Sequence, residues 1–127
     1  MNLKELMLNY LREEGFCPKE EEFGLAFKCE GVSLLFLYDE DDDRYFRLML
    51  PGIFDVTEEN LPAVLVALNK VNSEIKIVKA YTPVPDSVWV GFELLVDSTP
   101  VLADLVPRGI SMLRAAQRLF YEALQQG

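Results

Sequence analysis

Apolar residues recur at helical spacing in three stretches of the chain, and these stretches predict three amphipathic helices. The first helix opens with Asn2 and Glu5, which have the spacing of a capping box, and Gly15 is its natural stop. The third helix begins near Thr99, and Pro107 is expected to kink or divide it. The apolar stripe of the second helix consists of Leu61, Val64, Leu65, Leu68 and Val71.

Between the first two helices, a charged stretch at 19–22 is interpreted as a solvated connection, and apolar and polar residues then alternate as in strands. A two-residue turn at 30–31 would place Leu25, Phe27 and Cys29 opposite Phe36, Leu34 and Val32. Closing the acidic loop 39–43 would then place Phe36, Leu34 and Val32 opposite Phe46, Leu48 and Leu50. Because every pair is apolar, the three strands share one apolar face, and a slip by one residue would destroy it.

The third of these strands is expected to end at 51–52, and two more strands follow the second helix. The fourth runs from Ile75 to about Tyr81, and the fifth alternates over residues 88–96. Two prolines in the loop between them leave their register ambiguous. We therefore predict a single α+β domain over residues 1–127, with an antiparallel sheet of about five strands in the order α-β-β-β-α-β-β-α.

The second face of the predicted sheet is more apolar than a face in contact with water usually is. It carries the candidate protein-interaction residues Leu35, Leu37, Met49, Trp89 and Leu95. Tryptophan is enriched at interface hot spots, although ordinary local packing of Trp89 is an equally weighted alternative. Since monomers rarely leave large apolar patches in water, we expect a homodimer or another protein segment to cover this face.

The charge of the chain narrows the choice of partners. It has 12 Lys and Arg residues against 21 Asp and Glu residues, a net charge of −9, and its basic residues are scattered. We therefore expect neither nucleic acid nor a membrane as a partner. The chain opens without the pattern of a signal peptide and has no apolar run of membrane-spanning length, so we expect a cytoplasmic protein with two free cysteines.

The sequence offers little for catalysis. It contains no histidine, which excludes every Ser-His and Cys-His catalytic arrangement. It also contains no glycine-rich phosphate-binding loop. Asp39, Asp41 and Asp43 match the first ligands of a calcium loop, but Arg44 replaces its glycine, so an exposed hairpin loop is the better interpretation. Cys17 lies among acids and is interpreted as an idle thiol. We therefore predict no enzyme activity, no cofactor and no metal site.

The element order, with residues 57–61 (TEENL) and 68–72 (LNKVN), resembles the YbjN-like family of bacterial proteins and, more broadly, the type III secretion chaperone fold. Secretion chaperones are non-enzymatic homodimers around which an extended segment of cargo wraps, and YbjN-like proteins are described as regulators of sensory transduction. The resemblance implies this fold and a role in binding other proteins. It carries over no catalytic residue.

Three hypotheses about function follow. The leading one is a non-catalytic, chaperone-like or regulatory module that is homodimeric and binds a partner polypeptide through its apolar sheet face and a helix surface. The alternative is a small-ligand-binding regulatory domain of a bacterial sensory pathway, which predicts a sizeable cavity with a few converging polar groups. The third is an enzyme that uses carboxylates alone, which predicts acids clustered in a cleft.

Overall fold

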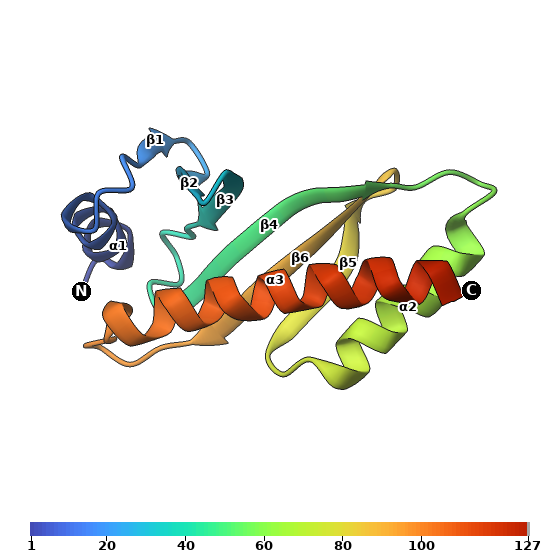
Figure 1. Ribbon diagram of the computed structural model, residues 1–127. Coiled ribbons are helices and arrows are strands. Elements are labelled where there is room, and N and C mark those ends of the chain that lie inside the picture. The colour runs from blue at the N-terminus through green and yellow to red at the C-terminus, as the bar shows by residue number, and fades with distance from the viewer. Residues whose placement is uncertain (127) are drawn as a thin grey trace.

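The computed structural model describes residues 1–126, which form three helices and a six-stranded antiparallel sheet (Figure 1). The elements in chain order are α1 (Leu3–Glu13), β1 (Lys19–Glu21), β2 (Gly24–Cys29), β3 (Val32–Leu37), β4 (Tyr45–Asp55), α2 (Leu61–Glu74), β5 (Val78–Val84), β6 (Ser87–Leu95) and α3 (Leu102–Gln126). The strand order in the sheet is β1-β2-β3-β4-β6-β5. This confirms the predicted α+β class.

The strand that the sequence did not predict is β1, which lies in the stretch interpreted as a solvated connection. Lys19 pairs with Ala26 and Glu21 pairs with Gly24, so the segment extends the edge of the sheet. Its charged residues lack the β-branched and aromatic side chains that indicate a strand. The pairing with β2 therefore decides the conformation, and the local sequence does not reveal it.

The β2–β3 hairpin has the predicted register, with Phe27 opposite Leu34. Its turn residues Glu30 and Gly31 both have positive φ, at 52° and 80°, which matches the twist that a two-residue hairpin turn requires.

The register predicted between β3 and β4 is wrong by two residues, because Phe36 lies opposite Leu48 rather than Phe46. A two-residue shift keeps every side chain on its face, so the apolar pattern cannot detect it. The loop decides the register instead. The carboxylate of Asp43 accepts hydrogen bonds from the Leu3 backbone N–H at 2.8 Å and the Tyr38 hydroxyl at 2.5 Å, which ties the loop to the start of α1.

Two expected breaks do not occur. β4 continues past Pro51 to Asp55, with an irregularity between Leu50 and Phe54 in which Gly52 has a φ of 59°. Helix α3 is one continuous element that contains Pro107. It runs the length of the sheet, with α1 near its start and α2 beside its later turns (Figure 1).

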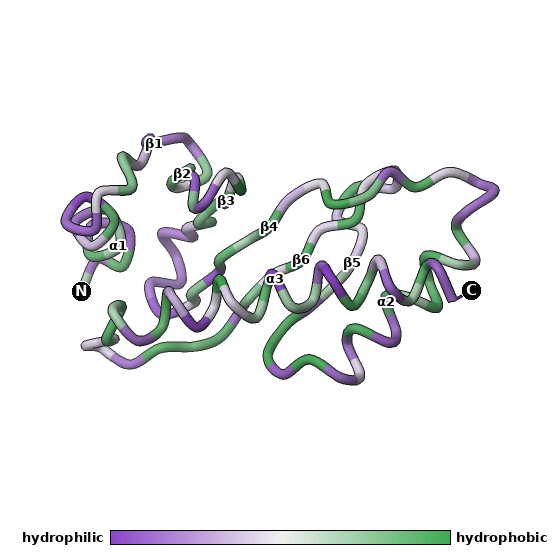
Figure 2. The backbone as a smooth tube through the Cα atoms, in the orientation of Figure 1, coloured by the Kyte–Doolittle hydropathy of each residue, from purple (hydrophilic) through white to green (hydrophobic). Residues whose placement is uncertain are grey.

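All three helices pack on the same face of the sheet. Side chains from every helix form one buried cluster with alternating residues of β2, β3, β4, β5 and β6. At its centre, the ring centroids of Phe36 and Phe46 lie 5.2 Å apart and those of Phe46 and Phe92 lie 6.2 Å apart. Gly109 lets α3 approach closely, because a Cβ atom there would lie 2.8 Å from the Phe92 ring. Hydrophilic and hydrophobic residues alternate along α3, as expected for a helix with one buried side (Figure 2).

Candidate functional site

The second face of the sheet, which we call the open face, lies outside the buried cluster formed with the helices. Its side chains come from the alternate positions of the same strands, and the strand pairing arranges them in rows. One row contains Ala26, Leu35, Met49, Gly91 and Lys79, and the next contains Gly24, Leu37, Arg47 and Glu93. Tyr45 pairs with Leu95 at one end, and Tyr81 pairs with Trp89 at the other.

The five candidate interaction residues share the open face but do not form one patch. Leu35 and Leu37 are half-buried neighbours on β3, whereas Trp89 is half-buried and Leu95 is 75% exposed on β6. Six residues of extended strand separate Leu95 from Trp89, which corresponds to about 20 Å. Met49 has no exposed area, so it can serve only as the floor beneath a bound partner.

A group of polar side chains, here called the polar ladder, divides the open face. It consists of Tyr45, Arg47, Lys79 and Glu93. The Tyr45 hydroxyl donates a hydrogen bond to the Glu93 carboxylate, and Lys79 Nζ lies 3.6 Å from Glu93 Oε2. The Arg47 guanidinium carbon lies 4.9 Å from the centroid of the Tyr45 ring, within the range of a cation–π contact. Lys79 is the one member from β5, whose register against β6 the sequence left ambiguous.

The carboxylate of Glu93 shifts the pKa of Tyr45 and of the nearby Tyr81. The hydrogen bond to the Glu93 carboxylate, with burial and the same negative charge, raises the pKa of Tyr45 to about 12. Burial and the charge of Glu93 also raise the pKa of Tyr81. Both phenols stay protonated at neutral pH, and that of Tyr45 donates its hydrogen bond to Glu93.

Two polar atoms of the ladder are buried without a hydrogen bond to any residue in 1–126: Nε of Arg47 and Oε2 of Glu93. A buried polar group without a partner is costly, so such atoms are rare in folded proteins. Glu93 Oε2 still has the Lys79 charge nearby, whereas Arg47 Nε lacks an acceptor.

Helix α2 presents a second apolar surface, here called the α2 patch. It consists of Leu61, Leu65 and Val66, which are 40%, 55% and 69% exposed. The sequence assigned Leu61 and Leu65 to the buried stripe, and that assignment is wrong. The other three residues of the predicted stripe, Val64, Leu68 and Val71, are buried, together with Ala67. Because apolar residues surround most of this helix, the helical period alone could not fix which side faces the core.

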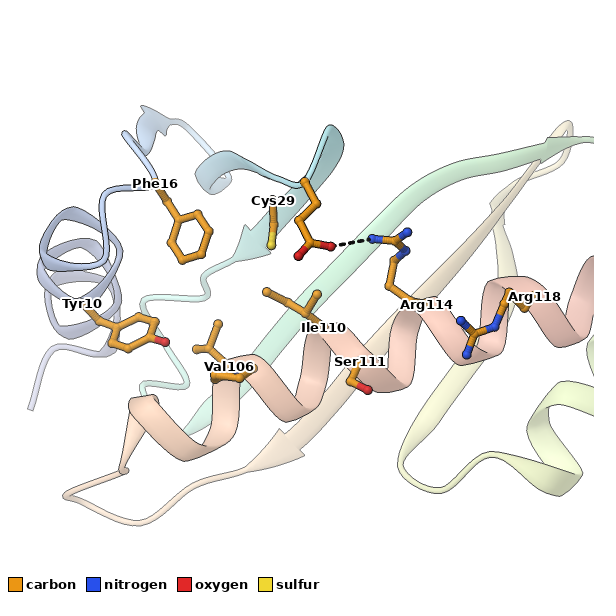
Figure 3. Close-up of a pocket in the computed structure, with 10 residues that line it drawn as sticks. Tyr10, Phe16, Cys29, Val106, Ile110, Ser111, Arg114 and Arg118 are labelled. Carbon is orange, nitrogen blue, oxygen red and sulfur yellow. Dashed lines mark ion pairs between the residues drawn. The ribbon is translucent and has the colours of Figure 1, made fainter.

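A groove of about 450 Å³ lies between α1, the β2–β3 hairpin and α3 (Figure 3). Tyr10, Phe16 and Cys29 point into it from one side, and Val106 and Ile110 line it from α3. The two arginines on its α3 side are Arg114 and Arg118. The sequence could not reveal this groove, because its walls come from segments about 80 residues apart in the chain.

The remaining candidates have structural explanations. Within residues 1–126 no group of His, Cys, Asp or Glu side chains has the arrangement of a metal site. In the acidic loop, Asp39 accepts the backbone N–H of Asp41, and Asp43 caps the start of α1. Hydrogen bonds from Leu3 and Tyr38 lower the pKa of Asp43. Cys17 is an exposed free thiol, and Cys29 is a half-buried one.

Acidic residues do line a second hollow, between α1 and the first strands: Glu5, Glu20, Glu22 and Glu40. Lys4 lies among them, with Nζ 3.8 Å from Glu20 Oε1. No helix among residues 1–126 is long and apolar enough to cross a membrane.

Solved structures match the chain over almost its whole length, although no protein-family model and no curated protein matches its sequence. YbjN from E. coli, a candidate transcription regulator, superposes with a TM-score of 0.67 over 96% of this chain and 91% of YbjN, at 16% identity. The chain has a YbjN-like fold. An uncharacterised protein from Methanothermobacter thermautotrophicus superposes with a TM-score of 0.63 over 97% of this chain and 96% of its own, at 15% identity.

The segment 68–72, on which the YbjN-like resemblance partly rested, has a clear structural role. The side-chain amide of Asn72 donates to the Ala80 carbonyl at 3.0 Å and accepts from the Ala80 N–H at 2.7 Å. Ala80 lies on β5, the edge strand of the sheet, so Asn72 satisfies backbone groups that point away from β6. This residue therefore ties α2 to the edge of the sheet.

Proposed function

We propose that this chain is a non-catalytic protein-interaction module that binds a partner polypeptide on the open face and pairs with a second copy through the α2 patch. The observation that carries the proposal is the open face itself. Leu35 and Leu37 on β3 and Trp89 on β6 remain half-buried on this face. The apolar side chains of an extended polypeptide would cover the leucines and the tryptophan.

The proposal that the module is not an enzyme rests on its side-chain chemistry. The chain contains no histidine, the commonest general acid or base. The acids that line the hollow beside α1 are accompanied by Lys4, which neutralises part of their charge. If the module regulates transcription, as its structural neighbour YbjN is a candidate to do, a chain with a net charge of −9 would act through proteins rather than by binding DNA.

Self-association through the α2 patch is supported by charge. Two chains that each carry −9 repel each other, so contact is least costly where the surface is uncharged and apolar. The α2 patch meets both conditions, with exposed Leu65 and Val66 one turn from Leu61 and Pro62. Equivalent surfaces of two copies can pair about a twofold axis.

Light scattering after size exclusion tests this pairing. We expect the wild-type chain to elute with twice its 14.5 kDa mass, and the double variant Leu65→Gln/Val66→Gln to elute as a monomer. Lys70→Gln, a substitution on an exposed position of the same helix, is the matched control and should remain dimeric. A wild-type chain that stays monomeric at high concentration contradicts the pairing.

The open face is tested by quantitative capture from the native cell with immobilised wild-type chain and two variants. We expect the wild type to retain one protein in stoichiometric amount and the variant Leu37→Gln/Trp89→Gln to lose it. Lys28→Gln, at an exposed position at the margin of the same face, should retain it. Equal capture by all three chains would show that the open face is not the binding surface.

A second candidate function is supported by the groove beside α3. The alternative of a regulatory domain for a small ligand required a sizeable cavity with converging polar groups. The groove has that size, and polar groups of Tyr10, Arg114 and Arg118 surround it. The two functions use different surfaces and are compatible in one molecule.

A further inference from the structure

One part of the groove beside α3 is apolar. The rings of Tyr10 and Phe16, the thiol of Cys29 and the side chain of Ile110 point into one space (Figure 3). Its volume of about 450 Å³ lies within the range of small-molecule sites, roughly 300–1,000 Å³. The groove therefore has the size that the apolar body of a small molecule requires.

The thiol and the phenol in the groove are neutral. Burial, more than the charge of Glu30, raises the pKa of the Cys29 thiol. Burial also raises the pKa of Tyr10, with the Glu14 carboxylate adding to the effect. At neutral pH the groove thus offers an uncharged thiol as apolar lining and a phenol that can donate a hydrogen bond.

The charge at the α3 side of the groove is positive. Arg114 and Arg118 are four residues apart on α3, a spacing that places like charges side by side and destabilises a helix slightly. Arg118 makes no ion pair with any residue in 1–126. Arg114 lies 3.8 Å from Glu30, whose side chain is 81% exposed, so this pair is weak and a ligand can replace it.

We propose that this groove binds a small organic carboxylate, with its apolar body against Phe16, Cys29 and Ile110 and its carboxylate on Arg114 and Arg118. Charge complementarity selects the anion, because two neighbouring guanidinium groups otherwise lack a strong partner and arginine binds carboxylates through paired hydrogen bonds. The proposal does not depend on the open face or on the α2 patch. It assigns the chain a regulatory ligand class in addition to its proposed protein partner.

Calorimetry with decanoate and decanol tests the proposal, because these probes share an apolar chain and differ in charge. We expect saturable binding of one decanoate per chain, at least tenfold tighter than decanol. The double variant Arg114→Gln/Arg118→Gln should lose this tenfold preference. Arg108→Gln, an exposed arginine on the same helix outside the groove, is the matched control and should keep it.

A second readout locates the ligand. Cys29 lines the groove, whereas Cys17 is exposed outside it. We expect bound decanoate to slow the alkylation of Cys29 by iodoacetamide severalfold and to leave the alkylation of Cys17 unchanged. Peptide mass spectrometry distinguishes the two thiols in one sample, so Cys17 is an internal reference.

Three results would overturn the proposal. If decanol equals decanoate in affinity, the arginines have no role. If decanoate binding persists in the arginine double variant and vanishes in Trp89→Gln, the ligand lies on the open face. If an acetylated apolar tripeptide with a free carboxylate binds where decanoate does not, the groove binds a polypeptide end.

Discussion

The two faces of the sheet are built from the same strands and differ in almost every physical respect. Along β4, Phe46 and Leu48 point toward the helices and are fully buried. Tyr45 and Arg47, which alternate with them, point to the open face. The covered face is uniformly apolar, and its rings pack edge to face. The open face mixes apolar side chains with the polar ladder. This difference indicates that the covered face stabilises the fold, and the open face is the one on which we propose that a partner binds.

The largest expected effect comes from substituting adjacent residues on the two faces of β3. Phe36→Ala should lower the free energy of unfolding by about 3–5 kcal/mol, because it removes a fully buried ring and leaves a cavity. Leu35→Ala, on the open face, should cost about 1 kcal/mol, since its side chain is only half-buried. Urea unfolding measures both values.

Because Phe36→Ala could leave little of a total stability of about 5–15 kcal/mol, Phe36→Leu is a milder second variant. It should cost more than Leu35→Ala. If Leu35→Ala is as costly as the substitutions of Phe36, the open face is as tightly packed as the core, and the distinction between the faces is wrong.

The sequence predicts the face of the sheet on which each side chain lies better than it predicts which residues lie beside that side chain. Strict alternation identifies Phe36, Phe46 and Phe92 as members of one face, and the structure confirms this. The alternation is the same after a shift of two residues, so it cannot fix the register. Phe36 lies opposite Leu48 because Asp43 anchors the loop to α1. A hydrogen bond between residues 40 positions apart cannot be inferred from the local pattern of apolar and polar residues.

The candidate sites show the same limit. The sequence identifies the open face and its five candidate residues, but it cannot show that Met49 is buried beneath its neighbours. The polar ladder depends on the pairing of β6 with β4 and, for Lys79, on the register of β5 against β6, which two prolines left ambiguous. The α2 patch and the groove depend on how the helices are oriented and packed, and no local pattern determines that.

The next test concerns the helix layer on the covered face. Asn72→Ala should lower the free energy of unfolding by about 1–3 kcal/mol, because it leaves the backbone N–H and carbonyl of the buried Ala80 without partners. The matched control is Asn69→Ala on the same helix. Its side-chain amide is exposed and makes no hydrogen bond to residues 1–126, so the substitution should cost less than about 0.5 kcal/mol. Equal costs for the two variants would show that Asn72 does not anchor β5.

A smaller effect is expected at high pH, from one tyrosine on the open face and one beside the acidic loop. The hydrogen bond to Glu93 raises the pKa of Tyr45 from 10.0 to about 12, and the hydrogen bond to Asp43 raises that of Tyr38 to about 12. A raised pKa in the folded state stabilises the protein below pH 10, and this stabilisation is lost between pH 10 and 12. The free energy of unfolding should therefore fall in that window.

Tyr45→Phe and Tyr38→Phe should each make this fall shallower, and the double variant should show the shallowest fall. Urea unfolding at a series of pH values from 9 to 12 measures the slopes. If neither substitution changes the slope, the two phenols are not held by carboxylates in the folded protein, and the polar ladder is not formed as described.

The smallest effect is expected for the ion pair of the open face. Lys79 Nζ lies 3.6 Å from Glu93 Oε2, but 56% of the lysine side chain is exposed, so water screens the attraction. Lys79→Gln should therefore cost less than about 1 kcal/mol, and the cost should shrink as NaCl is added. Lys79→Arg keeps the charge and is the matched control. A loss as large as that of Phe36→Ala would mean that Glu93 lies in a dry interior, and a face with such an interior could not be open to a partner.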